Sequence, residues 1–168
     1  MSPRVAIACV CVVVGLAAII AISSTAGPPD GYVVFHERDV RVYLPDAFRT
    51  TAEGERDILI AVVGPDRDSV QVAVVPRRGR SMARYERFTL ANVRNAVPSA
   101  TDLRREDVDV PGADEARRMT LHDPDRDRDI TIVIARDDKR FVTLSIDERA
   151  GSDALDEGTV EDSFALTG

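Results

Sequence analysis

Apolar and polar residues alternate along several short segments of the chain, and this pattern constrains the fold more than any other feature of the sequence. In the segment "VRVYL", Val40, Val42 and Leu44 share one face of a strand. The same period of two recurs in three later segments, at residues 69–75, 130–135 and 141–147. Because successive side chains of a strand point to opposite faces, these runs predict β-strands with one large apolar face.

Other segments extend the predicted sheet. Residues 58–63 are apolar on both faces, which is typical of a strand inside a sheet. Weaker patterns occur at residues 32–36, 103–110 and 116–121. Together these segments give about eight candidate strands.

A helix is predicted from Ser81 to Val97. Apolar and small side chains recur there at intervals of three or four and form one stripe, made of Met82, Tyr85, Thr89, Val93 and Ala96. Ser81 is a suitable N-cap, and Pro98 ends the helix.

A second helix is predicted near the carboxyl end, capped by Ser152. Acids then occupy its first turn, where the helix dipole favours them, and Leu155, Val160 and Phe164 anchor it on the sheet. The order of elements predicts an α+β domain, with a mostly antiparallel sheet of about seven to eight strands covered by two helices.

The amino-terminal residues 1–26 resemble an export signal. An apolar run of 18 residues, from Val5 to Ile22, follows Arg4, and small residues at Ser24 and Ala26 suit signal peptidase. The run reaches the length that spans a bilayer, about 17–25 residues. Residues 1–26 are therefore a membrane anchor or a signal peptide cleaved at Ala26, and the long apolar run favours the anchor. In both cases a connector at 27–31 leads to a domain at 32–168 that lies outside the cytoplasm, under the positive-inside rule.

Cysteine usage and charge exclude several kinds of site. Both cysteines, Cys9 and Cys11, lie in the apolar run, so residues 27–168 have no thiol for a disulfide or a cysteine-ligated zinc site. The formal net charge of -7 argues against a nucleic-acid-binding protein.

The tetrapeptide "PDRD" occurs twice, at residues 65–68 and 124–127. A calcium loop starting at Asp123 would need glycine and glutamate where Arg128 and Ile134 stand. Proline and aspartate favour tight turns, so both copies predict hairpin tips rather than metal sites. The residues flanking the two copies match too poorly to indicate a duplicated unit.

No catalytic motif is present. The two histidines, His36 and His122, have no partner at metal-ligand spacing, and the chain has neither a nucleophile elbow nor a glycine-rich phosphate loop. No catalytic residue, metal ligand or cofactor-binding residue is predicted. The alternative is a small hydrolase outside the cytoplasm that uses His36 or His122, since a catalytic triad assembles in space rather than in sequence.

A cluster of arginines is the best candidate for a partner-binding surface. Residues 77–88 carry five arginines against one glutamate, a local charge of 5 − 1 = +4. The candidate binding residues are Arg77, Arg78, Arg80, Arg84, Arg87 and Arg94. They predict an anionic partner, such as lipid head groups, an anionic envelope polymer or an acidic protein surface. The alternative is an ordinary solvated helix face.

The segment "VRVYLPDAF" resembles the opening of domains with the PsbP-like fold, in which a strand ends in Leu-Pro before a small residue and an aromatic. The closing "VTLSIDERAG…VEDSFAL" is also similar, so the resemblance spans about residues 32–166. In bacteria this group includes LpqN-type envelope lipoproteins and domains associated with type VII secretion in actinobacteria. Phe48 stands where a tryptophan is common, and the lipid-bearing cysteine is missing. The resemblance implies a non-enzymatic accessory or binding module of the cell envelope.

Overall fold

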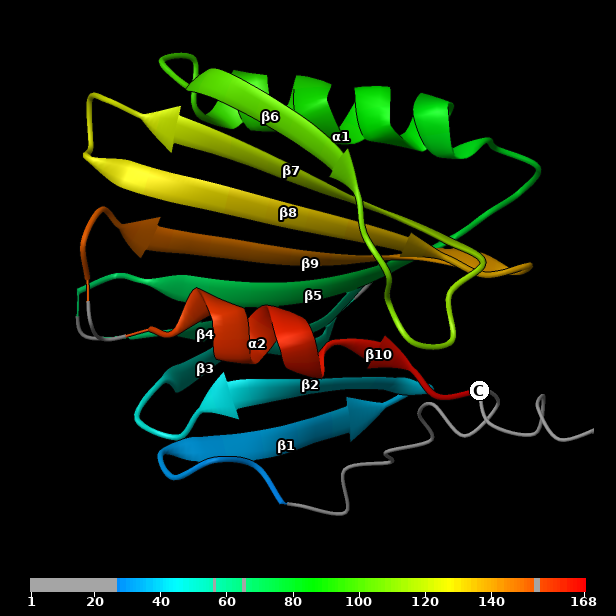
Figure 1. Cartoon of the computed structure of the whole chain (residues 1–168), viewed down its shortest axis with the longest axis horizontal. Coiled ribbons are helices and arrows are strands. Elements are labelled where there is room, and N and C mark those ends of the chain that lie inside the picture. Colours follow the sequence, from blue (N-terminus) through cyan, green and yellow to red (C-terminus); the bar gives the residue numbers. More distant parts are fainter. Residues whose placement is uncertain (1–26, 56, 65, 153–154) are drawn as a thin grey trace, which may run out of the picture.

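Ten strands and two helices form the fold in the computed structural model, which describes residues 27–55, 57–64, 66–152 and 155–168. Their order is β1 (Tyr32–Glu37), β2 (Val40–Pro45), β3 (Arg49–Glu55), β4 (Ile58–Val63), β5 (Ser69–Pro76), α1 (Met82–Ala96), β6 (Thr101–Asp107), β7 (Glu115–Asp123), β8 (Arg128–Arg136), β9 (Arg140–Arg149), α2 (Glu157–Ser163) and β10 (Ala165–Leu166) (Figure 1). Each pairing between described strands is antiparallel, which confirms the predicted α+β class.

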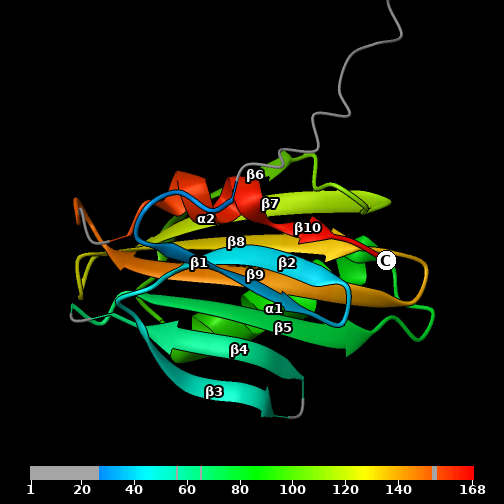
Figure 2. The same ribbon diagram turned by 90° about the horizontal axis from the view of Figure 1, so that it is seen from below.

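Seven strands form the large sheet, in the order β3-β4-β5-β9-β8-β7-β6. Helix α1 covers one face of this sheet (Figure 2). Met82, Tyr85 and Leu90 of the helix pack on a cluster of apolar side chains from three central strands, namely Met119, Leu121, Ile130, Ile132, Ile134 and Phe141. Burying the apolar surface of these side chains stabilises the layer by about 25 cal/mol for each Å² removed from water.

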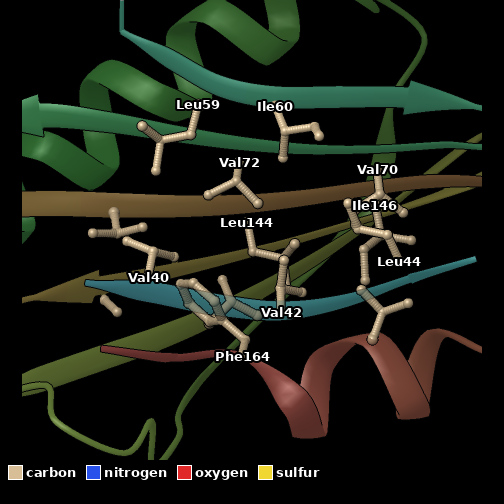
Figure 3. Packing of buried hydrophobic residues seen from close by; sticks show 14 of the residues in the cluster. Val40, Val42, Leu44, Leu59, Ile60, Val70, Val72, Leu144, Ile146 and Phe164 are labelled. Atoms are coloured by element: carbon tan, nitrogen blue, oxygen red, sulfur yellow. The ribbon is translucent and has the colours of Figure 1, made fainter. Parts of the chain in front are cut away.

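A three-stranded sheet, ordered β1-β2-β10, covers the other face of the large sheet together with α2. The side chains of Val40, Val42 and Leu44 on β2 face those of the large sheet, and Phe164 closes the layer (Figure 3). The alternation in residues 40–44 thus marks a buried face, as predicted.

The large sheet is buried on both faces, which the sequence pattern did not indicate for every strand. In β8, Ile132 faces α1, whereas Val133 and Ala135 belong to the core beneath the small sheet. In β9, the alternation of residues 141–147 implies an outward face for Thr143, but Thr143 is buried and its hydroxyl lies 3.2 Å from that of Tyr85. This expectation is wrong because α1 covers the face on which Thr143 lies.

Helix α1 begins and ends where the sequence predicts. The Ser81 hydroxyl accepts a hydrogen bond from the backbone N–H of Arg84, and the helix ends at Ala96, just before Pro98. One position of the predicted stripe is wrong, because Ala96 is exposed and Leu90 is buried instead.

The second predicted helix is shorter than expected. It begins at Glu157, and its N-cap is Asp156, whose carboxylate accepts the backbone N–H of Thr159. Ser152 is not the cap, since its hydroxyl donates to the carboxylate of Asp68 at 2.9 Å. The apolar anchors are confirmed, because Leu155, Val160 and Phe164 are buried.

The described residues of both "PDRD" copies lie at hairpin tips, as predicted. The first lies between β4 and β5, and the second joins β7 to β8. Arg128, just after the second copy, donates to the backbone carbonyls of Asp66 at 3.3 Å and Arg67 at 3.0 Å. It also contacts the carboxylate of Asp68 at 3.2 Å. The two turns therefore lie together, and one side chain joins them.

Two strands were not predicted. β3 reads "RTTAEGE", without the alternation that marks a strand with one buried face, because it is an edge strand of the large sheet. β10 has only two residues and pairs with β2 directly after α2. The small sheet and the large sheet therefore hold ten strands between them rather than about eight.

Candidate functional site

The exposed side of α1 carries the predicted arginine surface. Arg84, Arg87 and Arg94 are exposed, whereas Tyr85 and Leu90 of the same helix are buried against the sheet. Within the described residues, none of the three forms an ion pair with a carboxylate. The structure therefore leaves these three guanidinium groups available to a partner.

The other three predicted arginines lie in the turn that precedes α1. Arg78 is exposed, with a left-handed backbone at φ 46°. Arg77 is half-buried, and its Nε donates to the carbonyl of Arg80 at 3.3 Å, so its side chain supports the turn. Arg80 is also half-buried. The surface called the α1 face below consists of the exposed residues Arg78, Arg84, Arg87, Phe88 and Arg94.

Glu86 does not reduce the charge of the α1 face, although it counts toward the local charge in the sequence. Its side chain is turned toward the sheet and is 3% exposed. It pairs with Arg105 at 2.9 Å and Arg117 at 2.8 Å. Glu86 therefore does not lie among the exposed arginines of the helix, although it is counted with them in the segment's composition.

Phe88 is the feature of this surface that the sequence analysis missed. It is 56% exposed and lies one helical turn from Arg84. Its ring centre lies 6.3 Å from that of Tyr85. The helical stripe gave no reliable signal for it, because Phe88 and Leu90 both fall outside the stripe and only Phe88 is exposed.

The second candidate is a polar pocket that contains His122. It encloses about 330 Å³ on the face of the large sheet away from α1, and it is lined by Arg104, Thr120, Leu121, His122, Asp129, Thr131 and Glu157. His122 Nδ1 lies 2.9 Å from Asp129 Oδ1, across the pairing of β7 with β8. A carboxylate at that distance orients an imidazole ring.

Glu148 lies next to this pocket, directly opposite Asp129 in the pairing of β8 with β9. Burial raises the pKa of Glu148 to about 7, and the negative charges of Glu157, Asp68 and Asp129 add to the shift. A carboxyl group of this kind can exchange a proton near neutral pH.

The pH dependence of stability tests this assignment. The pKa of Glu148 rises from 4.5 to about 7 on folding, so the folded state binds the proton more tightly than the unfolded chain. We therefore expect the free energy of unfolding to fall by about 1–3 kcal/mol as the pH rises through this range, and then to level off. Urea denaturation of the wild type and of Glu148→Gln at several pH values measures this decrease in the free energy of unfolding. The glutamine variant should lose this part of the slope, and equal slopes would contradict the raised pKa.

His36, the other candidate catalytic residue, lies elsewhere. It is exposed on β1 in the small sheet, and its Nε2 is 3.0 Å from the hydroxyl of Thr167. The structure does not place His36 with His122, which belongs to β7 of the large sheet. In the part of the chain that the structure describes, no group of three or more potential ligands could hold a metal ion.

The predicted anchor at residues 5–22 lies outside the described residues. Among the helices that the structure describes, none is both long enough and apolar enough to cross a bilayer.

Comparison with known proteins shows the fold. No protein-family model matches the chain, and no curated protein matches its sequence. The solution structure of cyanobacterial PsbP (CyanoP) from Synechocystis sp. PCC 6803 matches with a TM-score of 0.59 and 12% identity, over 81% of this chain and 92% of that one. The Saccharomyces cerevisiae Ran-binding protein Mog1p matches with a TM-score of 0.51 and 9% identity, over 81% and 95%. A variant of Mog1 matches with a TM-score of 0.53 and 11% identity, over 81% of this chain and 95% of that one. The expected PsbP-like fold is confirmed, and at these identities the similarity shows the fold alone.

Proposed function

We propose that this protein is a non-enzymatic accessory domain that binds an anionic partner through the α1 face. The single observation that carries the proposal is the set of exposed arginines without carboxylate partners on α1, among the described residues. The four arginines of β7 and β8 form a contrast, since Arg117, Arg118, Arg128 and Arg136 are all paired with acids. The chain has 29 acidic and 22 basic residues, so acids are abundant enough to pair with these arginines as well.

The fold supports a binding role. One structure of the same fold is that of a Ran-binding protein, which shows that this architecture can bind another protein. We extend this to the present chain only as a class of function, because the identity between the two is 9%.

We further propose that the domain works outside the cytoplasm, tethered by residues 5–22 or secreted after cleavage at Ala26. The apolar run and its flanking residues support this location. The resemblance to LpqN-type proteins supports a place in the actinobacterial cell envelope and an association with secretion. The intact mass of the protein recovered from membranes distinguishes the anchored form from the cleaved form.

Charge reversal tests the α1 face. Replacing Arg78, Arg84, Arg87 and Arg94 with glutamate should abolish retention on isolated cell envelopes of the full-length protein, held in nanodiscs of zwitterionic lipid so that its apolar segment 5–22 is already occupied. Retention of the wild type should weaken as salt is raised, since exposed charges are screened within about 10 Å at 0.1 M salt. Arg49→Glu on β3 is the matched control, because Arg49 is also exposed and lies on the far edge of the large sheet. If the fourfold variant is retained as well as the wild type, the α1 face is merely solvated.

The His122 pocket supports a second candidate function, a small hydrolase. The observation that favours it is the 2.9 Å contact between His122 and Asp129, which resembles the pair of a base and an orienting acid. Thr120 and Thr131 line the same pocket. A hydrolytic activity that His122→Ala removes and His36→Ala retains would establish this function in place of pure binding.

A further inference from the structure

Phe88 adds an apolar contact to a surface that is otherwise cationic. The residue is 56% exposed, and its ring centre lies 6.3 Å from that of Tyr85. Tyr85 beneath it stacks on Phe141 with ring centres 4.3 Å apart, and the Tyr85 hydroxyl lies 3.2 Å from that of Thr143. Aromatic residues and arginines are enriched at the centres of protein–protein interfaces, where a rigid aromatic side chain loses little entropy on binding.

Arg84 occupies a position at which helix stability favours the opposite charge. With Ser81 as the N-cap, Arg84 is the third helical residue, where glutamate or glutamine would complete a capping box. The positive end of the helix dipole also repels a guanidinium group there. The first turn of α1 contains no acid, although the chain has 29 acidic residues. The stability of the helix therefore does not account for Arg84, whereas a binding role does.

The position of α1 limits where its partner can be. Residues 27–31 lead into β1, which lies in Figure 1 at the opposite end of the molecule from α1. The nine residues 23–31 between the apolar run and β1 span at most about 30 Å. A domain tethered on the side of β1 presents α1 away from its own membrane. This geometry favours a partner in the aqueous space over the adjacent lipid head groups.

We propose that the α1 face binds an acidic protein segment that also presents an apolar side chain. Phe88 is the apolar anchor, and Arg84, Arg87 and Arg94 contact the carboxylates. The inference rests on the proposed function and adds to it the class of partner, a protein rather than a lipid or an envelope polymer.

A binding titration tests the role of Phe88. Full-length protein in nanodiscs of zwitterionic lipid is titrated with a fluorescent amphipathic peptide of glutamate and leucine, and with the same peptide carrying serine in place of leucine. We expect Phe88→Ala to weaken binding of the leucine peptide by about tenfold and to leave the weaker serine peptide unaffected. Val34→Ala removes another exposed apolar side chain, on β1, and should change neither affinity.

Arg84→Glu separates binding from folding. The substitution completes the capping box, so the midpoint of urea denaturation should rise. Affinity for the leucine peptide should nevertheless fall by about tenfold or more, because an attractive charge becomes repulsive. A loss of binding in a more stable protein cannot be caused by unfolding. Arg49→Glu makes the same charge change on β3 and should leave the affinity unchanged.

Each other outcome overturns a defined part of the proposal. If charge reversal abolishes envelope retention but Phe88→Ala has no effect on the leucine peptide, the anionic-partner function stands and the protein partner is wrong. If vesicles of phosphatidylglycerol bind through Phe88 and the peptide does not, the partner is a membrane. If charge reversal changes neither envelope retention nor the affinity for the leucine peptide, both the inference and the proposed function fail.

Discussion

Replacing Asp68 with alanine is expected to lower the free energy of unfolding by about 3–5 kcal/mol, the range for removing one partner of a buried ion pair. Asp68 is fully buried at the first "PDRD" turn. Its carboxylate accepts the backbone N–H of Arg149 at 2.8 Å and the hydroxyl of Ser152 at 2.9 Å. It also pairs with Arg128 at 3.2 Å. Alanine leaves all three donors without this acceptor at a position that is itself fully buried.

Urea denaturation of Asp68→Ala measures the loss, and Asp66→Ala is the control. Asp66 lies in the same turn but is exposed, so its substitution should change stability by no more than about 0.5 kcal/mol. A double-mutant cycle with Arg128→Met should give a coupling energy of about 1–3 kcal/mol, because the two side chains are in contact. A loss below about 1 kcal/mol for Asp68→Ala would show that the two turns hold together without this carboxylate.

The network around Asp68 also shows where prediction from the sequence ends. The turns themselves follow from local chemistry, because proline and aspartate favour tight turns wherever they occur. The contact of Arg128 with Asp68 joins residues 60 positions apart, and no local pattern indicates it. The segment from Asp123 to Asp129 contains four aspartates and two arginines. The local sequence does not distinguish the aspartates from one another, and only the fold determines which of them are buried.

The same distinction applies to α1 and to the strands. The N-cap at Ser81 was predictable because capping depends on the next few residues alone. The burial of Glu86 was not, since it depends on Arg105 and Arg117 of two later strands. β3 was missed because an edge strand with little apolar surface has no alternation to detect. Of the candidate site, the arginines were predictable from composition, and the exposure of Phe88 required the structure.

A second large loss of stability is expected when Gly112 is replaced with alanine. Gly112 has a φ of +80°, and an added Cβ would lie 1.8 Å from the backbone carbonyl oxygen of Leu166 in β10. This oxygen cannot move alone, because the N–H of Thr167, which belongs to the same peptide unit, donates to the carbonyl of Asp39 at 2.9 Å. The left-handed conformation costs about 1–2 kcal/mol for alanine, and overpacking against the backbone adds about 1–3 kcal/mol. We expect a total loss of roughly 2–5 kcal/mol in the free energy of unfolding.

Gly79→Ala is the matched control for this substitution. Gly79 has a similar φ of +73°, but an added Cβ there would meet no atom within 4 Å. The control should lose only the conformational part, about 1–2 kcal/mol, so the difference between the variants isolates the contact with β10. Hydrogen exchange should show faster opening of β10 and β2 in Gly112→Ala, since β10 closes that edge of the small sheet. Equal losses in the two variants would show that the chain at Pro111 moves aside readily. In that case β10 would not depend on this contact for its place beside β2.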